Sequence, residues 1–346
     1  MNELGSSSRR RRARCLRATR SASLAVSLTL MACDVEWGGV QVAVHEPVFV
    51  RQETLAVADT ARLPPLVMPS GPLLFHVRRT SRAGDATLRV VGEFADTTLL
   101  PAGPQREERA REYIAKFTAD YLRPDQSYVM FRGGARVGTF YVRAPRVEGS
   151  GLCARLEAEG RIELRPRLDT LSEFLAWAPG VREGFEDYVA PEQRANMAEL
   201  AQVLAQRGVN RLREDWFLGG PDDLRAVNVG SGPVALAATF MTRDSLAEGT
   251  PADSAGMAFL VADFDPARGY FPLFFEAEWY GPGSKRALRW VDAANIVGDT
   301  LSEWVAQAYG DEESWYELIG SVGGSREVIW TSRRSVCEAR QAAASP

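Results

Sequence analysis

Residue types that commonly carry chemistry are scarce in this 346-residue chain. It contains only two histidines, His45 and His76, and only Lys116 and Lys285 are lysines among its 41 basic residues. The metalloprotease motif HExxH, the phosphate-binding motif GxxxxGK[ST] and the serine motifs GxSxG and SxxK are all absent. The common hydrolase and nucleotide-binding classes therefore have no signature here, and the sequence predicts no catalytic residue, no cofactor and no metal site.

Long apolar runs and a basic surface are lacking as well. After residue 33 no apolar run reaches ten residues, whereas a membrane-spanning helix needs about 20. Residues 1–32 hold seven arginines and one acid, so 34 basic and 44 acidic residues remain, a net charge of about −10. An acidic body without clustered Lys and Arg is a poor match for nucleic acid, because phosphate contacts need such clusters. The sequence predicts no nucleic-acid partner.

The first 32 residues have the order of an export signal. A basic stretch from Arg9 to Arg20 precedes the apolar run Ser21–Ala32. A positive segment followed by a short apolar segment and a small residue is typical of a cleaved signal peptide. A twin-arginine signal is a weaker alternative, because no Phe-Leu pair follows Arg9–Arg12.

The end of this segment, Leu30-Met31-Ala32-Cys33, resembles the lipobox of bacterial lipoproteins. The resemblance implies that Cys33 becomes the lipidated N-terminus, carrying a diacylglyceryl group and often a further acyl chain such as palmitate. It implies a protein of the bacterial cell envelope, anchored to a membrane and facing the periplasm. Two or three acyl chains give stable anchoring. The alternative is plain secretion after cleavage near Ala32, with Cys33 as an ordinary residue.

Two cysteines remain after Cys15 in the leader and Cys33 are set aside. Because an exported chain folds in an oxidising compartment, the sequence predicts a disulfide bond between Cys153 and Cys337. Two buried free thiols are the alternative.

The chain is expected to divide into six segments. They are a signal peptide at 1–32, a lipid-anchored tether at 33–72, a β-rich N-terminal domain with one helix at 73–165, a helical segment at 166–222, an antiparallel β domain at 223–337, and a disordered tail at 338–346. The predicted fold class is α+β, mainly antiparallel β in a sheet or barrel, with a helical insertion in the middle.

Periodicity locates the individual elements. Helices are predicted at 105–121, 168–177 and 191–207, the last with Pro191 at its first position. A strand pair across Gly160-Arg161 is predicted within 153–164. The other predicted strands are 72–79, 87–94, 127–132, 136–143, 234–241, 256–264, 270–279, 286–293, 303–309, 314–320 and 326–332.

Acidic pairs and aromatic residues are the features that could carry function. Glu276 and Glu278 share one face of a predicted strand, and Phe275, Ala277 and Trp279 share the other. The two acids could form an acid–base pair, but a strand with one face in solvent shows the same alternation without any catalytic role. Five of the eight tryptophans lie between 279 and 330, where they can form either a core or a ligand-binding face. Asp263 and Asp265 are expected to end a strand, and the run Asp311–Glu313 adds further acids.

The segment Asn295–Val305 faintly resembles the loop of extracellular FG-GAP or VCBS-type repeats. Asn295, Asp299 and Glu303 match its ligand positions, whereas Val297 replaces a ligand and Thr300 replaces the glycine. The resemblance implies either a calcium site or a degenerate turn capped by Asp299, and the lost carboxylate and glycine favour the turn.

Two function classes follow. The preferred one is a lipid-anchored extracytoplasmic binding or accessory module without catalytic activity, with a protein or glycan ligand. The alternative is an extracytoplasmic hydrolase, of the glycan-cleaving type, that uses paired carboxylates.

Overall fold

The computed structural model describes residues 65–95, 98–182, 187–229, 234–296 and 302–332. They belong to one compact unit, Leu63–Pro346. Strands dominate, all pairings are antiparallel and two α-helices are present among the described residues, so the predicted α+β class is confirmed. The signal peptide, Cys33, the tether up to residue 64, Cys337 and the tail at 338–346 lie outside the described residues.

The first half of the body is a six-stranded barrel. Its sheet has the order β1-β7-β4-β5-β6-β2-β3, and β1 also pairs with β2, which closes the ring and leaves β3 as a flank. The strands are β1 (Leu73–Arg79), β2 (Asp85–Ala95), β3 (Thr98–Leu100), β4 (Ser127–Arg132), β5 (Ala135–Glu148), β6 (Arg155–Leu164) and β7 (Glu173–Trp177). A short turn of 3₁₀-helix, η2 (Gly151–Cys153), joins β5 to β6.

Side chains fill the barrel. Phe75, Val77, Leu88 and Phe140 are completely buried in its core. The helix α1 (Ala110–Tyr121), which follows the 3₁₀ turn η1 (Glu107–Arg109), adds Tyr113 and Phe117 to the same core. These two rings lie four residues apart and therefore share one helix face.

The second half of the body is a sandwich of two four-stranded sheets. Sheet B has the order β11-β10-β9-β8 and sheet C the order β12-β13-β14-β15. Sheet B contains β8 (Asp223–Val227), β9 (Ala235–Thr242), β10 (Ala255–Asp265) and β11 (Gly269–Tyr280). Sheet C contains β12 (Ala287–Ala294), β13 (Glu303–Tyr309), β14 (Ser314–Val322) and β15 (Ser325–Thr331).

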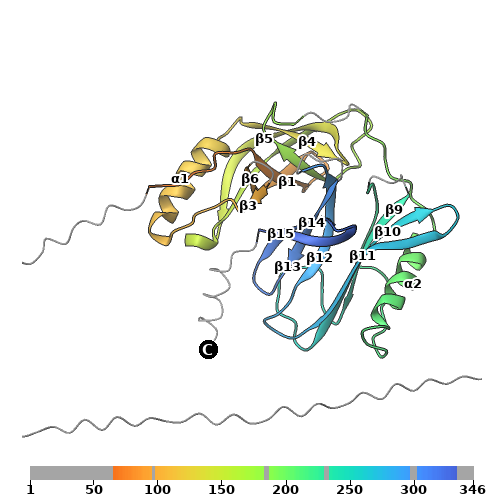
Figure 1. The fold of residues 1–346 in the computed structure, drawn as a ribbon. Helices are drawn as coiled ribbons and strands as arrows, with labels where there is room; N and C mark the ends of the chain where they lie inside the picture. The colour runs from red at the N-terminus through yellow and green to blue at the C-terminus, as the bar shows by residue number, and fades with distance from the viewer. Residues whose placement is uncertain (1–64, 96–97, 183–186, 230–233, 297–301, 333–346) are drawn as a thin grey trace, which may run out of the picture. The chain divides into compact units, whose positions relative to one another are not determined.

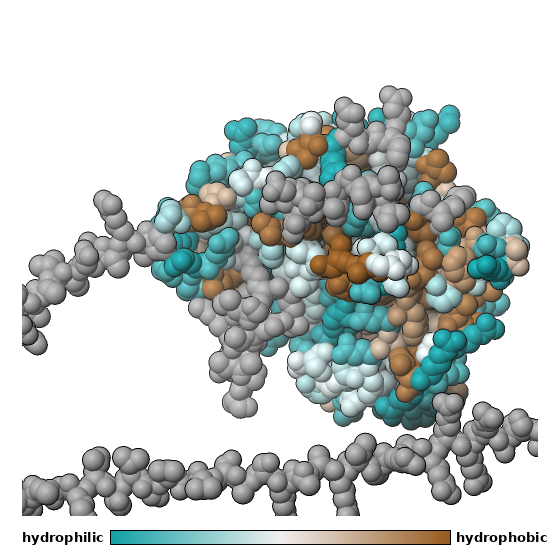
Figure 2. Space-filling view, viewed as in Figure 1, coloured by the Kyte–Doolittle hydropathy of each residue, from teal (hydrophilic) through white to brown (hydrophobic). Residues whose placement is uncertain are grey.

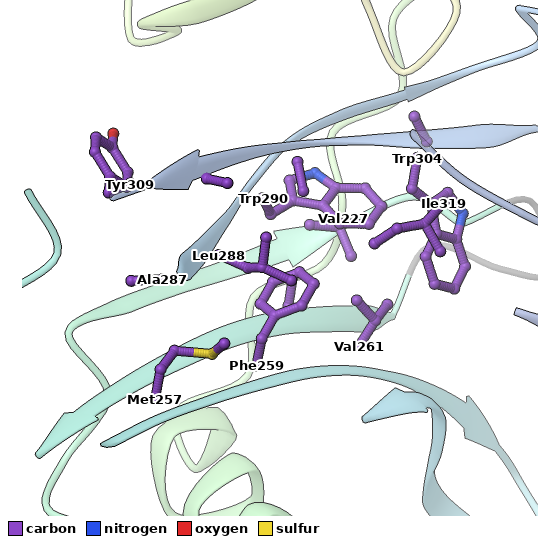
Figure 3. Packing of buried hydrophobic residues seen from close by; sticks show 14 of the residues in the cluster. Val227, Met257, Phe259, Val261, Ala287, Leu288, Trp290, Trp304, Tyr309 and Ile319 are labelled. Atoms are coloured by element: carbon purple, nitrogen blue, oxygen red, sulfur yellow. The ribbon is translucent and has the colours of Figure 1, made fainter. Parts of the chain in front are cut away.

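The two sheets face each other across an apolar core. Figure 3 shows Phe259 and Val261 of sheet B pointing toward Leu288, Trp290 and the strands of sheet C. Each sheet packs against a neighbouring layer on both of its faces. The helix α2 (Met197–Val209) covers the other face of sheet B, and the other face of sheet C packs on the outside of the barrel. Helix, sheet B, sheet C and barrel thus form successive layers (Figure 1).

The helix predicted at 168–177 is wrong: residues 168–172 form turns and irregular backbone, and the second half is a strand. Residues Glu173–Trp177 form β7, which pairs with both β1 and β4. Phe174 and Ala176 face the barrel core, while Leu175 and Trp177 pack against sheet C, so every residue is buried. A short run that is apolar on both faces has no period that distinguishes a strand from a helix. The expected helical segment 166–222 therefore contributes a barrel strand as well as α2.

Two further details differ from expectation. The helix predicted from Pro191 begins at Met197. The predicted turn at Gly160-Arg161 is absent, because β6 runs through it and Gly160 lies where a Cβ atom would come within 2.1 Å of the Tyr141 carbonyl oxygen. This glycine allows close strand contact and does not mark a turn.

Residues 65–72, assigned to the tether, are attached to the barrel. Leu66 and Met68 pack against its core. The Ser70 and Gly71 backbone N–H groups donate to Glu93 Oε1 at 2.6 and 2.7 Å. The body therefore begins before the first strand.

Candidate functional site

A buried polar network joins the barrel to the sandwich, and Glu173 is at its centre. This residue begins β7 and is 5% exposed. Its carboxylate accepts the guanidinium of Arg225 from β8, and Arg289 Nη2 of β12 lies 2.7 Å from Glu173 Oε1. One carboxylate thus bonds to side chains from both sheets of the sandwich.

The charge state of Glu173 follows from its neighbours. Burial acts to raise the pKa of this carboxyl, but the His76 ring and the guanidinium groups of Arg289 and Arg225 outweigh it and hold the pKa well below its usual value. Glu173 is therefore ionised at neutral pH. Its negative charge compensates the buried Arg289, and it shares the partly buried Arg225 with Asp223, whose Oδ2 lies 2.9 Å from Arg225 Nε.

His76, on the neighbouring strand β1, completes the centre. Its Nδ1 atom lies 2.9 Å from the Tyr316 hydroxyl, and its Nε2 atom lies 3.8 Å from Glu173 Oε1. Nε2 has no hydrogen-bond partner among the described residues. Burial lowers the pKa of His76 to about 3, an effect that Glu173 opposes and that Arg289 and Arg89 reinforce. The ring is neutral at pH 7 and buried.

From Arg289 the network continues toward the surface. Arg289 Nη2 donates to Gln307 Oε1 at 2.9 Å, and Tyr309 donates its hydroxyl to the same oxygen at 3.0 Å. Ser314 then links Arg89 of the barrel, whose Nη1 donates to Ser314 Oγ at 2.7 Å, to Glu248, which accepts from that hydroxyl at 2.7 Å.

A pocket lies beside this outer end of the network. Its volume, counted as the space that the centre of a water molecule can reach, is about 80 Å³. Its polar lining includes Arg89, Arg155, Ser314 and Tyr316. The arginines are already engaged, because Arg155 donates to Glu248 at 2.6 Å and to Glu148 at 2.8 Å, and Arg89 contacts Ser314. The pocket therefore offers hydrogen-bonding groups whose charges are balanced.

Glu276 and Glu278 do not occupy a plain solvent face. Their opposite neighbours Phe275, Ala277 and Trp279 pack on the side of sheet B that α2 covers, so the two carboxylates point to the side of sheet C. There Arg286 binds both Glu276 and Glu317 of β14. The predicted alternation is correct, and its consequence is an ion-pair bridge between the two sheets.

Glu276 and Glu278 have different electrostatic surroundings within this cluster. Burial raises the pKa of Glu278, Arg286 opposes that effect, and Glu276 adds to it. Glu276 is directly paired with the guanidinium of Arg286. A carboxyl with a raised pKa beside a second carboxyl that is paired with an arginine is an arrangement that acid–base catalysis uses.

Two of the remaining acids, Asp265 and Asp311, hold turns and loops. Asp265 Oδ1 accepts from the backbone N–H groups of Ala267 and Arg268 at 2.7 and 3.0 Å, which closes the turn between β10 and β11. Asp311 accepts from the backbone of Gly283 and Lys285, both at 3.1 Å. These carboxylates have the turn-forming role expected for Asp265.

The clustered tryptophans belong mainly to the core. Trp290, Trp304 and Trp315 are at most 3% exposed. Trp279 packs edge-on against Trp216, and Trp330 packs against the core between the barrel and sheet C. These rings do not form an exposed stacking face.

Only the ends of the segment that resembles a calcium loop are described. Asp299 and Thr300 lie outside the described residues, while Glu303 is 3% exposed and its Oε2 accepts from the Ile296 backbone N–H at 2.7 Å. Among the described residues no group of three or more His, Cys, Asp or Glu side chains is arranged to hold a metal ion.

Sequence reasoning missed the polar centre. Glu173 lies in a segment interpreted as a helix, and Arg225 lies in a strand that was not predicted. It also missed Lys285, which is 2% exposed and bonds to Asp244 at 2.9 Å and to two backbone carbonyls. The one available signal was the scarcity of lysine, which makes Lys285 conspicuous.

No protein-family model matches the chain, and neither a curated protein nor a solved structure is significantly similar to it. None of the helices in the described part of the chain has the length and apolar character needed to cross a membrane.

Proposed function

We propose that this chain is a lipoprotein of the bacterial cell envelope, attached through Cys33 to a membrane on the extracytoplasmic side. The observation that carries the proposal is the order of the leader, in which arginines precede a short apolar run that ends at Leu30-Met31-Ala32-Cys33. The compact unit starts at Leu63, so the 29 residues 34–62 separate the lipid site from it.

The body itself acts as a binding or accessory module. Two features of the described residues support this. Glu276 is paired with Arg286 and Asp265 closes a turn, and the polar network around Glu173 is buried between layers, where a substrate has no access. Its ligand is a protein or a glycan at the cell envelope.

Cys33→Ser tests the anchor. The variant should leave the membrane fraction and lose incorporation of labelled palmitate, because no thiol remains at the lipid site. Cys15→Ser, in the leader, is the matched control and should behave as the parent. Membrane retention of Cys33→Ser with unchanged processing would disprove the proposal.

A glycan-cleaving hydrolase is the alternative function, and the raised pKa of Glu278 beside the arginine-paired Glu276 is the observation that favours it. Such an enzyme would lose turnover of cell-wall glycan on Glu278→Gln, while Glu312→Gln, at an exposed position, would keep it. If neither the parent nor the variants cleave the glycan detectably, the hydrolase alternative is rejected and the binding module is retained.

A further inference from the structure

The loop that follows α2 exposes apolar side chains in an unusual way. Phe217 is 76% exposed, although Trp216 and Leu218 on either side are only 3% and 6% exposed. Leu212 in the same loop is 63% exposed, and Val203 on the adjoining part of α2 is 49% exposed. Large side chains at this level of exposure are the features that mark interaction surfaces when they occur together.

The backbone on both sides of Phe217 is held in place. Gln206 Nε2 of α2 donates to the Trp216 carbonyl at 2.7 Å, and the Leu218 N–H donates to Gln206 Oε1 at 2.9 Å. Gln202 Nε2 also donates to the Leu218 carbonyl at 2.9 Å, and Trp216 Nε1 donates to Thr242 Oγ1 at 3.0 Å. Because both neighbours are buried and bonded, the loop presents Phe217 outward as a defined feature.

Exposed arginines occur in the same helix end and loop as these apolar side chains. Arg207 in the last turn of α2 and Arg211 beside Leu212 are exposed, as are Arg213 and Arg243, whose guanidinium groups lie over the Trp279 ring. Two acids, Glu214 and Asp215, lie in the loop, and Asp215 is paired with Arg213. We call Val203, Arg207, Arg211, Leu212 and Phe217 the α2 loop patch. Figure 2 shows apolar and charged residues side by side over this part of the body.

We infer that the α2 loop patch contacts the surface of an anionic phospholipid membrane. Exposed Phe and Leu insert at the boundary between headgroups and acyl chains, while arginines bind the anionic headgroups with their apolar stems along the surface. The patch has this composition, whereas the chain after residue 32 is acidic as a whole.

The proposed lipid anchor at Cys33 would also place the body next to a membrane. The 29 residues between Cys33 and Leu63 reach at most about 100 Å when fully extended. The lipid would therefore keep the body close to a bilayer and raise its effective concentration there. The inference rests on the proposed function for this choice of partner, but the patch can be tested without the lipid.

The test uses the chain from residue 33 onward with Cys33→Ser, which lacks both leader and lipid, and vesicles of phosphatidylglycerol with phosphatidylethanolamine. Co-sedimentation should show binding that falls with added salt and is weak on phosphatidylcholine vesicles. Leu212→Ser/Phe217→Ser should lower binding by roughly tenfold, and Arg207→Gln/Arg211→Gln should remove the preference for anionic lipid. Val322→Ser, at another exposed apolar position on sheet C, is the matched control and should bind as the parent.

Unchanged melting temperatures confirm that the variants are folded. Equal vesicle binding by parent and double variant would overturn the inference. So would a parent that is dimeric in solution and becomes monomeric in Leu212→Ser/Phe217→Ser, because the patch would then be a contact between two copies. Loss of vesicle binding leaves the Cys33 fractionation result untouched, and failure of lipidation leaves the vesicle result untouched.

Discussion

The two faces of sheet C make contacts of opposite kinds. Toward sheet B the contact is mainly apolar, built from Phe259, Leu288, Trp290 and their neighbours, with the ion pairs of Arg286 as its charged part. Toward the barrel an apolar centre is flanked by buried ions, with Glu173 between Arg225 and Arg289. Apolar packing stabilises by the area removed from water and tolerates many arrangements. Buried ions lose hydration and stabilise only one arrangement, in which every charge meets its partner. The first contact therefore supplies stability, and the second sets how the barrel and sandwich fit together.

The largest effect should come from truncation in the apolar contact. Phe259→Ala removes a fully buried ring between the two sheets and should lower the free energy of unfolding by about 3–5 kcal/mol. Because no charge is involved, the loss should be the same at pH 5 and pH 7. Urea unfolding followed by tryptophan fluorescence measures it. A loss below 1 kcal/mol would show that the sheets pack loosely.

The ionic contact should respond differently. Glu173→Gln leaves the buried Arg289 without its carboxylate partner, whereas Arg225 keeps Asp223, and should cost about 3 kcal/mol. Adding Arg289→Met should recover part of the loss, which Phe259→Ala cannot do. Glu312→Gln, an exposed acid, is the control. Additive losses in the double variant would contradict the proposed coupling.

The predicted disulfide would add a covalent bond to the same side of the molecule. Ser332, five residues before Cys337, lines the same pocket as Cys153, and Tyr316 accepts from its backbone N–H at 2.8 Å. Cys153→Ser should therefore lower stability by about 2–3 kcal/mol, less than the chain-entropy value of about 5 kcal/mol for this loop, because denatured chains keep some structure.

Mass analysis of the exported chain after alkylation without reductant gives the bonding state directly. Two alkylated cysteines among Cys153 and Cys337 would refute the bond.

The smallest effect is a pH dependence. The pKa of His76 is lowered to about 3 in the folded state, whereas in the unfolded chain it is near 6.5. Between these two pH values the unfolded chain binds a proton at His76 that the folded chain does not bind, so acid favours unfolding. Stability should fall as the pH decreases from 6.5, by about 1–2 kcal/mol between pH 7 and pH 5. Glu173, whose folded pKa is also lowered, adds a further loss below its unfolded value.

His76→Gln separates these contributions. Without the imidazole the slope between pH 7 and pH 5 should disappear, while the loss at lower pH from Glu173 stays. A variant with the parent's slope would assign the pH dependence to another group.

Local pattern predicted most of the elements. The strands Ser127–Arg132 and Glu303–Tyr309 begin and end where alternation and turn residues place them. α1 lies within the predicted helix, and its Tyr113 and Phe117 are buried as its period requires. These elements have one covered face or clear turn signals, so the relevant information lies within a few residues.

Other features were decided only by the tertiary structure, because they involve residues that contact partners distant in sequence. β7 is a strand because β1 and β4 pair with it on both sides, and Glu173 is acceptable inside because Arg225 and Arg289 arrive from two other sheets. The sequence by itself determined the strand-rich class and the order of the leader, since both depend on local spacing. The closure of the barrel, the ionic centre and the outward presentation of Phe217 depend on pairings between remote segments, which short-range periodicity does not encode.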